Sequence, residues 1–207
     1  ALVAEMLDGV PYGAPRDLHH RQHSSPARRS SALAVVDGVV YVGSGDGNVY
    51  ALDADTGALI WKSHVDDHPF ARVTASPTYH NGRLYVGIAS GEETAGAVAE
   101  YECCTFRGSL AVLDASNGAR VWKTYTIEEP QRRAKNRIGT QMWGPSGAPI
   151  WSSPAIDVQK NAVYVTTGNN YSGPATDRSD AFVAFDVTSG KILWSRQTTA
   201  SDDWNTA

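Results

Sequence analysis

The ten-residue phrase LDADTGALIW, residues 52–61, occurs in three related copies in this chain of 207 residues. It returns as LDASNGARVW at residues 113–122 and as FDVTSGKILW at residues 185–194. In every copy Asp precedes Trp by eight residues and Gly precedes it by four. Three copies with the same spacing indicate an internal repeat, which is the strongest guide to the fold.

Each phrase predicts an apolar strand, a tight turn built on Asp, Asn or Ser with Gly, and a second strand that ends in Trp. Two more short apolar strands precede each phrase, separated by turns such as Asp37-Gly38, Asn81-Gly82 and Lys160-Asn161. The expected upstream strands are Val35–Val36 and Val39–Val42, Ser76–Tyr79 and Arg83–Val86, and Ser153–Ile156 and Ala162–Thr166. Four short antiparallel strands make one propeller blade. The repeated Trp is expected to pack each blade against the next.

The predicted fold class is therefore all-β, part of a β-propeller of about three four-stranded blades. The blades are expected near residues 31–67, 73–129 and 150–199, after a polar N-terminal connector at residues 1–30 that contains His19, His20 and His23. Successive Trp residues of the repeat stand 61 and 72 positions apart, more than the roughly 40–50 residues of a compact blade. Insertions are therefore expected at residues 89–101 and 127–150. Because propellers close with about four to eight blades, we expect the chain to be part of a larger ring.

Composition narrows the function classes. The chain has 18 Lys and Arg against 22 Asp and Glu, so it lacks the basic excess that attracts nucleic acid. Its longest apolar runs are far shorter than the ~20 residues that span a bilayer. It does not begin with Met, so either a signal has been removed or the chain is a fragment. The stretch GSGDGN, residues 43–48, is followed by a strand and predicts a hairpin turn rather than a phosphate loop.

The only two cysteines, Cys103 and Cys104, are neighbours in sequence. A disulfide between them draws together alpha carbons ~3.8 Å apart across a trans peptide, closer than the usual lower limit of about 4.4 Å. Such a ring presents a hard, polarisable surface suited to a planar ligand. The alternative is a pair of reduced, buried thiols.

The repeats, together with YECCTFRGS (residues 101–109), GTQMWGP (139–145) and WSSPAID (151–157), give the chain a family resemblance. It resembles the quinoprotein alcohol dehydrogenases that use pyrroloquinoline quinone, most closely the polyvinyl alcohol dehydrogenase-like branch. The resemblance covers about residues 35–205. The repeats alone also occur in the outer-membrane assembly scaffold propeller, which binds no quinone.

The resemblance implies a shared site for the quinone and calcium. Thr74 matches a residue that hydrogen-bonds the quinone, and Trp151 matches one that stacks on it, although Trp151 can also be read as a core residue. Cys103, Cys104 and Arg107 complete the implied cofactor contacts.

Glu102 and Asn169 match the calcium ligands, with Glu92 and Glu93 as alternatives to Glu102, and with an ordinary turn as the alternative for Asn169. Calcium takes six to eight oxygens, and in the family the cofactor supplies those that the protein does not.

The resemblance departs from the family pattern at the catalytic base. The segment SDDWN, residues 201–205, places Asn205 where the family has a catalytic Asp, and an amide cannot accept the proton. Either Asp202 or Asp203 substitutes, or the base lies beyond this chain, or the piece is inactive. Arg29 also stands near the place of a cofactor-binding Arg, with a different local spacing.

The resemblance implies oxidation of a secondary or polymeric alcohol in the periplasm, with electrons passed to a cytochrome c. The alternative is a non-catalytic propeller scaffold that binds proteins through its loops.

Overall fold

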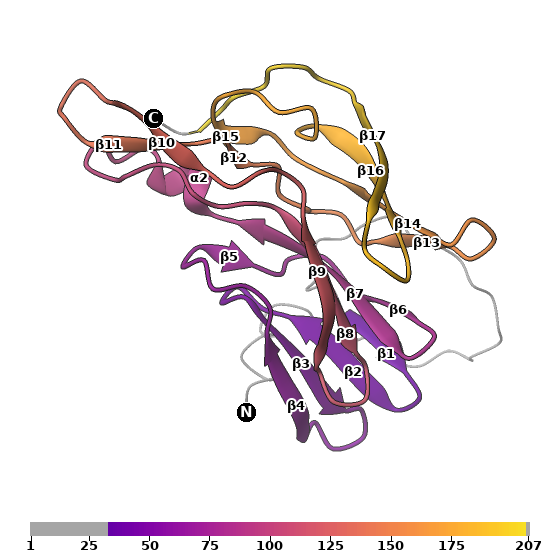
Figure 1. Ribbon diagram of the computed structural model, residues 1–207. Coiled ribbons are helices and arrows are strands. Elements are labelled where there is room, and N and C mark those ends of the chain that lie inside the picture. The colour runs from indigo at the N-terminus through magenta and orange to yellow at the C-terminus, as the bar shows by residue number, and fades with distance from the viewer. Residues whose placement is uncertain (1–32, 206–207) are drawn as a thin grey trace, which may run out of the picture. The chain divides into compact units, whose positions relative to one another are not determined.

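The computed structural model describes residues 33–205, which are almost entirely β-structure (Figure 1). Three sheets follow one another along the chain, each with its strands in sequence order and antiparallel. The first blade contains β1 (Leu33–Val36), β2 (Val39–Gly43), β3 (Asn48–Asp53) and β4 (Leu59–His64). The second contains β6 (Thr78–His80), β7 (Arg83–Ser90), β8 (Ser109–Asp114) and β9 (Arg120–Tyr125). The third contains β13 (Ala155–Asp157), β14 (Ala162–Thr166), β16 (Ala181–Asp186) and β17 (Ile192–Gln197).

The predicted strands and turns are confirmed. The turns between the first two strands of the first and second blades use Asp37-Gly38 and Asn81-Gly82, all four with positive φ. That backbone is the primed hairpin turn whose twist matches the flanking strands, and Asn, Asp and Gly adopt it most readily. Residues 43–48 form a hairpin connection as expected, with the Ser44 amide donating to the Asn48 carbonyl at 3.0 Å.

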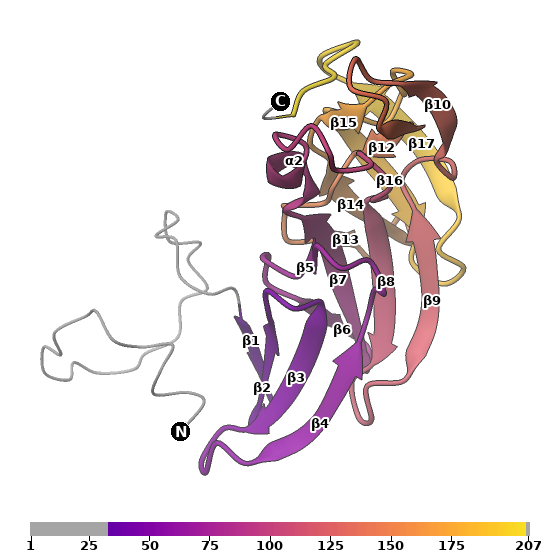
Figure 2. The same cartoon turned by 90° about the vertical axis from the view of Figure 1, so that its left-hand side faces the viewer.

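The central blade buries both of its faces because alternate residues of a strand point to opposite sides. On β7, Leu84 and Val86 join the apolar cluster shared with the first blade, whereas Tyr85 joins the cluster shared with the third. On β8, Leu113 and Val112 divide in the same way. Figure 2 shows the sheets of the first two blades next to each other. The blades therefore stack face to face through two apolar cores.

The repeated Trp performs the predicted packing role between blades. Trp61 donates from Nε1 to the carbonyl of Ala115 at 3.0 Å, and a Cβ on Gly118 would lie 2.6 Å from its ring. One blade further on, Trp122 packs in the same way over Gly190. The Gly of the second and of the third repeat phrase thus leaves room for the Trp of the preceding blade.

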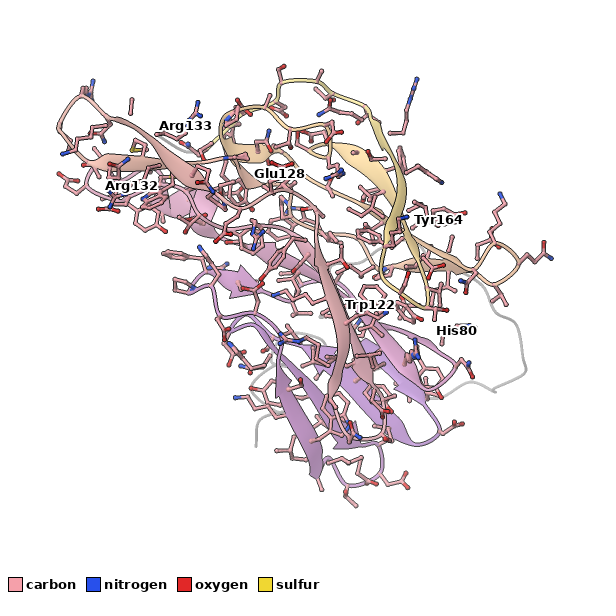
Figure 3. All side chains as sticks on the ribbon, in the orientation of Figure 1. His80, Trp122, Glu128, Arg132, Arg133 and Tyr164 are labelled. Carbon is pink, nitrogen blue, oxygen red and sulfur yellow. A yellow bond between two sulfur atoms is a disulfide. The ribbon has the colours of Figure 1, made fainter. Side chains whose placement is uncertain are left out.

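The two insertions carry structure of their own. The first follows β7 and holds the one-turn helix α2 (Glu92–Ala95). The second forms the hairpin β10 (Gln131–Lys135) and β11 (Gln141–Gly144), followed by β12 (Ser146–Gly147), which pairs with β15 (Asn170–Ser172). Arg132 and Arg133 lie on β10, at the edge of this hairpin (Figure 3). A short strand, β5 (Ala71–Arg72), pairs with the end of β7 beside α2. Within residues 33–205 no helix is long and apolar enough to cross a membrane.

Candidate functional site

Cys103 and Cys104 form a disulfide, the first of the two predicted alternatives, and both are buried. The peptide bond between them is cis rather than trans. The second insertion holds the pair through backbone hydrogen bonds. The Trp143 amide donates to the Cys103 carbonyl at 2.8 Å, and the Cys104 amide donates to the Trp143 carbonyl at 3.3 Å. The two insertions therefore meet at the disulfide.

Gly96, just after α2, brings the disulfide and the end of the described chain together. A Cβ on Gly96 would lie 3.2 Å from Cys103 Sγ and 3.2 Å from Asn205 Cγ. Asn205 is held there by its Nδ2, which donates to the Tyr171 carbonyl at 2.8 Å. The position where the family pattern has its catalytic Asp thus lies beside the cysteine pair. We call the meeting of Gly96, Cys103 and Asn205 the glycine junction.

Asn170 fixes the segment that leads into the glycine junction. Its amide donates to the Asp202 carbonyl at 3.1 Å, and its own carbonyl accepts from the Trp204 amide at 2.9 Å. Its side-chain Nδ2 donates to Asp203 Oδ1 at 3.0 Å, and the residue is fully buried. Asp203, one of the two predicted bases, is therefore already bound to Asn170. Asp202 lies next to Asp180, whose pKa is raised by burial and then by the Asp202 charge.

Asn169 and Trp151 adjoin the same segment. Asn169 donates from Nδ2 to the Trp204 carbonyl at 2.7 Å, so Oδ1 is the atom it can offer to a cation. Trp151 is 41% exposed, and its indole Nε1 would lie 3.1 Å from a Cβ on Gly168. A contact series therefore runs from Trp151 through Gly168 and Asn169 to Trp204 and on to the glycine junction.

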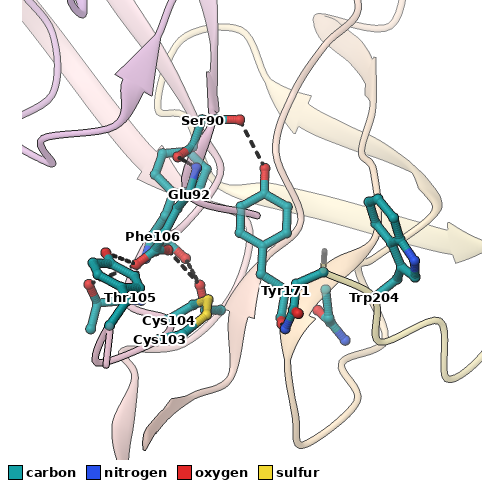
Figure 4. The surroundings of a disulfide bond; sticks show 12 residues. Ser90, Glu92, Cys103, Cys104, Thr105, Phe106, Tyr171 and Trp204 are labelled. Atoms are coloured by element: carbon teal, nitrogen blue, oxygen red, sulfur yellow. Dashed lines mark hydrogen bonds between the residues drawn. A yellow bond between two sulfur atoms is a disulfide. The ribbon is translucent and has the colours of Figure 1, made fainter. Parts of the chain in front are cut away.

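Two acidic residues follow β7 and have different surroundings. Glu92 is fully buried and accepts hydrogen bonds from Tyr101 and from the backbone after the cysteine pair (Figure 4). Burial would raise its pKa, but hydrogen bonds from His68, Thr105 and Phe106 outweigh it and hold the pKa below the ordinary value.

Glu93 is half-buried, and its pKa is raised by burial while the positive charge of Arg72 opposes the rise. Burial also raises the pKa of Tyr171, and the nearby negative charges of Glu93 and Glu92 add to that effect. The Glu93 backbone adjoins the glycine junction, since its carbonyl oxygen would lie 3.2 Å from a Cβ on Gly96. Glu93, the alternative in the predicted calcium set, is therefore on the side of the glycine junction.

Other predicted site residues have different neighbours. Glu102 is exposed, and its carboxylate accepts from Trp143 Nε1 at 3.1 Å. The Arg107 guanidinium lies 3.6 Å from the centroid of the Tyr125 ring. Thr74 is exposed in the connection between β5 and β6, and none of the hydrogen bonds described for residues 33–205 joins it to the disulfide loop. Arg29 and the three N-terminal histidines lie outside the described residues.

The donor set tests whether the residues fit calcium and a quinone. Within residues 33–205 no group of three or more His, Cys, Asp or Glu side chains could hold a metal ion. The protein therefore offers single oxygens, such as those of Glu93 and Asn169, and calcium needs further oxygens from a bound molecule. At the glycine junction Gly96 packs closely against the Cys103 sulfur, and both cysteines are buried. The single oxygens therefore fit a site that a cation shares with an oxygen-rich ligand.

The blades, the interlocking Trp residues and the disulfide at which the two insertions meet define a β-propeller of the quinoprotein type. A family model described as outer membrane protein assembly factor BamB matches residues 17–136. A polyvinylalcohol dehydrogenase from a Pseudomonas species is 46% identical over 155 residues, 74% of this chain and 24% of that protein. The same-named protein of Sphingopyxis is 44% identical, with the same coverage.

Among solved structures, a quinohemoprotein alcohol dehydrogenase from Comamonas testosteroni superimposes with a TM-score of 0.62 and 28% identity, covering 84% of this chain and 28% of that one. The chain belongs to the pyrroloquinoline quinone-dependent alcohol dehydrogenase family, in its polyvinyl alcohol dehydrogenase-like branch. It spans about a quarter of the length of the curated relatives it matches, 24% for the first two.

Proposed function

We propose that this chain forms part of the cofactor site of a periplasmic dehydrogenase that uses pyrroloquinoline quinone and calcium. Its substrate is a secondary or polymeric alcohol, and its electrons pass to a cytochrome c. The names of the relatives support the alcohol dehydrogenase activity. The observation that carries the proposal is the glycine junction, where Asn205 meets Gly96 and Cys103 although it lies about 100 residues after them in the sequence.

Five residues would form the site for the cofactor and the metal: Cys103, Cys104, Trp151, Glu93 and Asn169. The exposed ring of Trp151 is suited to stack on one face of a planar ligand, and the buried disulfide would support the loop beside that ligand. Glu93 and Asn169 Oδ1 would supply oxygens to calcium. We favour Glu93 over Glu102 because Glu102 is exposed and bound to Trp143, whereas Glu93 is half-buried and its backbone adjoins the glycine junction. When bound, the quinone supplies the electron acceptor and calcium polarises it.

The proton of the alcohol requires a carboxylate near the glycine junction. Asn205 cannot accept it, because a neutral amide has no basic site in this pH range. Asp202 and Asp203 are the carboxylates closest to Asn205 in the sequence, and we assign the role of base to one of these two residues. Asp202→Asn and Asp203→Asn, made one at a time, should show which of the two carboxylates is needed for alcohol oxidation but not for quinone binding.

The test of the site is quinone binding in the presence of calcium. We expect the chain to bind pyrroloquinoline quinone when calcium is supplied and to release it on chelation. Glu93→Gln should weaken this binding about tenfold or more, since a charged ligand to the metal is lost. Glu102→Gln is the matched control and should bind as the unmodified chain does.

Two other outcomes would change the conclusion. If quinone binding is weakened only in Glu102→Gln, then Glu102 and not Glu93 is the calcium ligand. No binding in any variant, with the fold intact, would favour the scaffold alternative that the assembly-factor family model also suggests.

A further inference from the structure

Glu92 has no place in the cofactor contacts proposed above, yet it is a fully buried carboxylate next to the disulfide loop. Its Oε1 accepts from the Tyr101 hydroxyl and from the Thr105 amide, both at 2.8 Å. Its Oε2 accepts from the Phe106 amide at 2.8 Å. Tyr101 precedes the cysteine pair and Thr105 follows it directly. One carboxylate therefore binds the loop on both sides of the disulfide.

Neighbouring groups complete the surroundings of this carboxylate. Ser146, on β12 of the second insertion, lies with its hydroxyl 3.3 Å from Oε2 and donates to the Phe106 carbonyl at 2.8 Å. His68 lies with Nε2 3.5 Å from Oε1 and 3.1 Å from the Thr105 hydroxyl. The Phe70 amide donates to His68 Nδ1 at 3.3 Å, so the ring hydrogen is on Nε2, facing Glu92 and Thr105. Segments before, within and after the disulfide loop thus converge on one side chain.

We infer that Glu92 is the positioning residue for the Cys103–Cys104 loop. It holds the disulfide in place at the glycine junction, where Cys103 meets Gly96 and Asn205. A buried carboxylate that accepts several amide hydrogens is costly to leave without them, so the bonds form together or not at all. Glu92 is also the residue before Glu93, so the same contacts fix the backbone from which Glu93 extends. The anchoring itself needs no cofactor, whereas its consequence for quinone binding rests on the proposed function.

The first test is local hydrogen exchange without any cofactor. In Glu92→Gln one oxygen becomes an NH2 group, which faces an amide donor instead of accepting from it. Exchange at the amides of Thr105 and Phe106 should accelerate about tenfold or more, as expected for loss of a hydrogen bond to a charged group. Glu100→Gln makes the same charge change at an exposed position of the same insertion and should leave this exchange unchanged.

The second test is the rate at which dithiothreitol reduces the disulfide. Attack by a thiolate requires access to a sulfur, and both cysteines are buried, with 1% and 0% of their surface exposed. Reduction therefore follows opening of the loop, and Glu92→Gln should speed it by a factor similar to that seen in exchange. Tyr101→Phe, which removes one contact and leaves the carboxylate in place, should give a smaller acceleration.

The results separate the anchor from the cofactor proposal. Unchanged exchange and reduction in Glu92→Gln would overturn the positioning role, and so would equal acceleration at amides of all three blades, because Glu92 would then act on global stability alone. If Glu92→Gln accelerates exchange and reduction only at the disulfide loop and also weakens quinone binding about tenfold, both proposals are supported. If exchange and reduction are accelerated only at the disulfide loop but the unmodified chain binds no quinone, the positioning role of Glu92 is supported and the proposed function is wrong.

Discussion

Trp61 of the first blade packs directly over Gly118 of the second, since a Cβ on Gly118 would lie 2.6 Å from the indole ring. The same indole donates from Nε1 to the Ala115 carbonyl at 3.0 Å. Ala115 also accepts from the Tyr41 hydroxyl at 3.2 Å, and Tyr41 and Trp61 are neighbouring rings. A Tyr and a Trp of one blade thus bind the turn of the next blade.

The first prediction concerns this Trp. Trp61→Phe should lower the free energy of unfolding by about 1–2 kcal/mol, because it removes one hydrogen bond and part of a buried ring. Trp194→Phe is the matched control, since Trp194 has the same place in its repeat but is 48% exposed, against 9% for Trp61. Urea denaturation of both variants measures the difference. Equal losses would show that the docking contact contributes nothing beyond the local strand.

The second prediction separates backbone strain from the docking contact. Gly57 and Gly118 both have positive φ, +69° and +73°, but only Gly118 has a Trp ring within 4 Å. Gly57→Ala should cost about 1–2 kcal/mol for the left-handed backbone alone. Gly118→Ala should cost about 1–3 kcal/mol more, because the added methyl group displaces the indole. Thermal unfolding of the two variants gives the comparison, and a similar cost for both would contradict the packing role of Gly118.

The third prediction is a pH dependence of stability. Asp114 accepts from the hydroxyl and the amide of Ser116, and these bonds hold its pKa below the ordinary value. The pKa of Asp53 is lowered in the same way by Thr56, and that of Asp186 by Ser189. A pKa lowered in the folded state stabilises the fold above the unfolded pKa of about 3.9, and this contribution is lost as the pH falls through the folded value.

The midpoint of thermal unfolding should therefore fall as the pH is lowered from 5 through about 4 and below. Asp114→Asn should be less stable than the unmodified chain at neutral pH, and its midpoint should fall less on acidification because one of the three aspartates is absent. Circular dichroism melts at several pH values provide the measurement. Parallel curves for the two proteins would show that Asp114 does not contribute.

The fold could be predicted from the sequence because the repeat encodes it locally. Asp, Gly and Trp at fixed spacing specify a turn and a docking side chain, and alternating apolar residues specify the strands. The cysteine pair is also evident in the sequence. Of its two interpretations, a disulfide or two reduced thiols, the structure shows the disulfide.

The surroundings of the disulfide depend on contacts between distant segments, which no local pattern records. Glu102 is next to the cysteines in sequence but exposed, whereas Glu92 and Asn205 lie far from them in sequence and contact the same loop. The sequence does contain one signal for Glu92 and Glu93, because they come one residue after the end of the apolar strand β7, where the insertion begins. No sequence pattern indicates that Gly96 or the carbonyl of Tyr171 belongs to the site.

The last prediction concerns the segment that ends at the glycine junction. Asn170→Ala removes the side-chain bond to Asp203 and the acceptor of the Thr176 hydroxyl, at 3.0 and 2.9 Å. Because Asn170 is fully buried, the loss leaves polar partners unsatisfied and should cost about 1–3 kcal/mol. We expect faster hydrogen exchange at the Trp204 amide and earlier proteolysis near residue 202, while exchange in the first blade stays unchanged. Asn161→Ala is the control, since Asn161 is exposed and makes a single side-chain bond to Asp186 at 2.8 Å. If the segment remains protected in Asn170→Ala, then the backbone bonds of residue 170 and the side chains of Asn169 and Asn205 are sufficient to hold the chain beside Cys103.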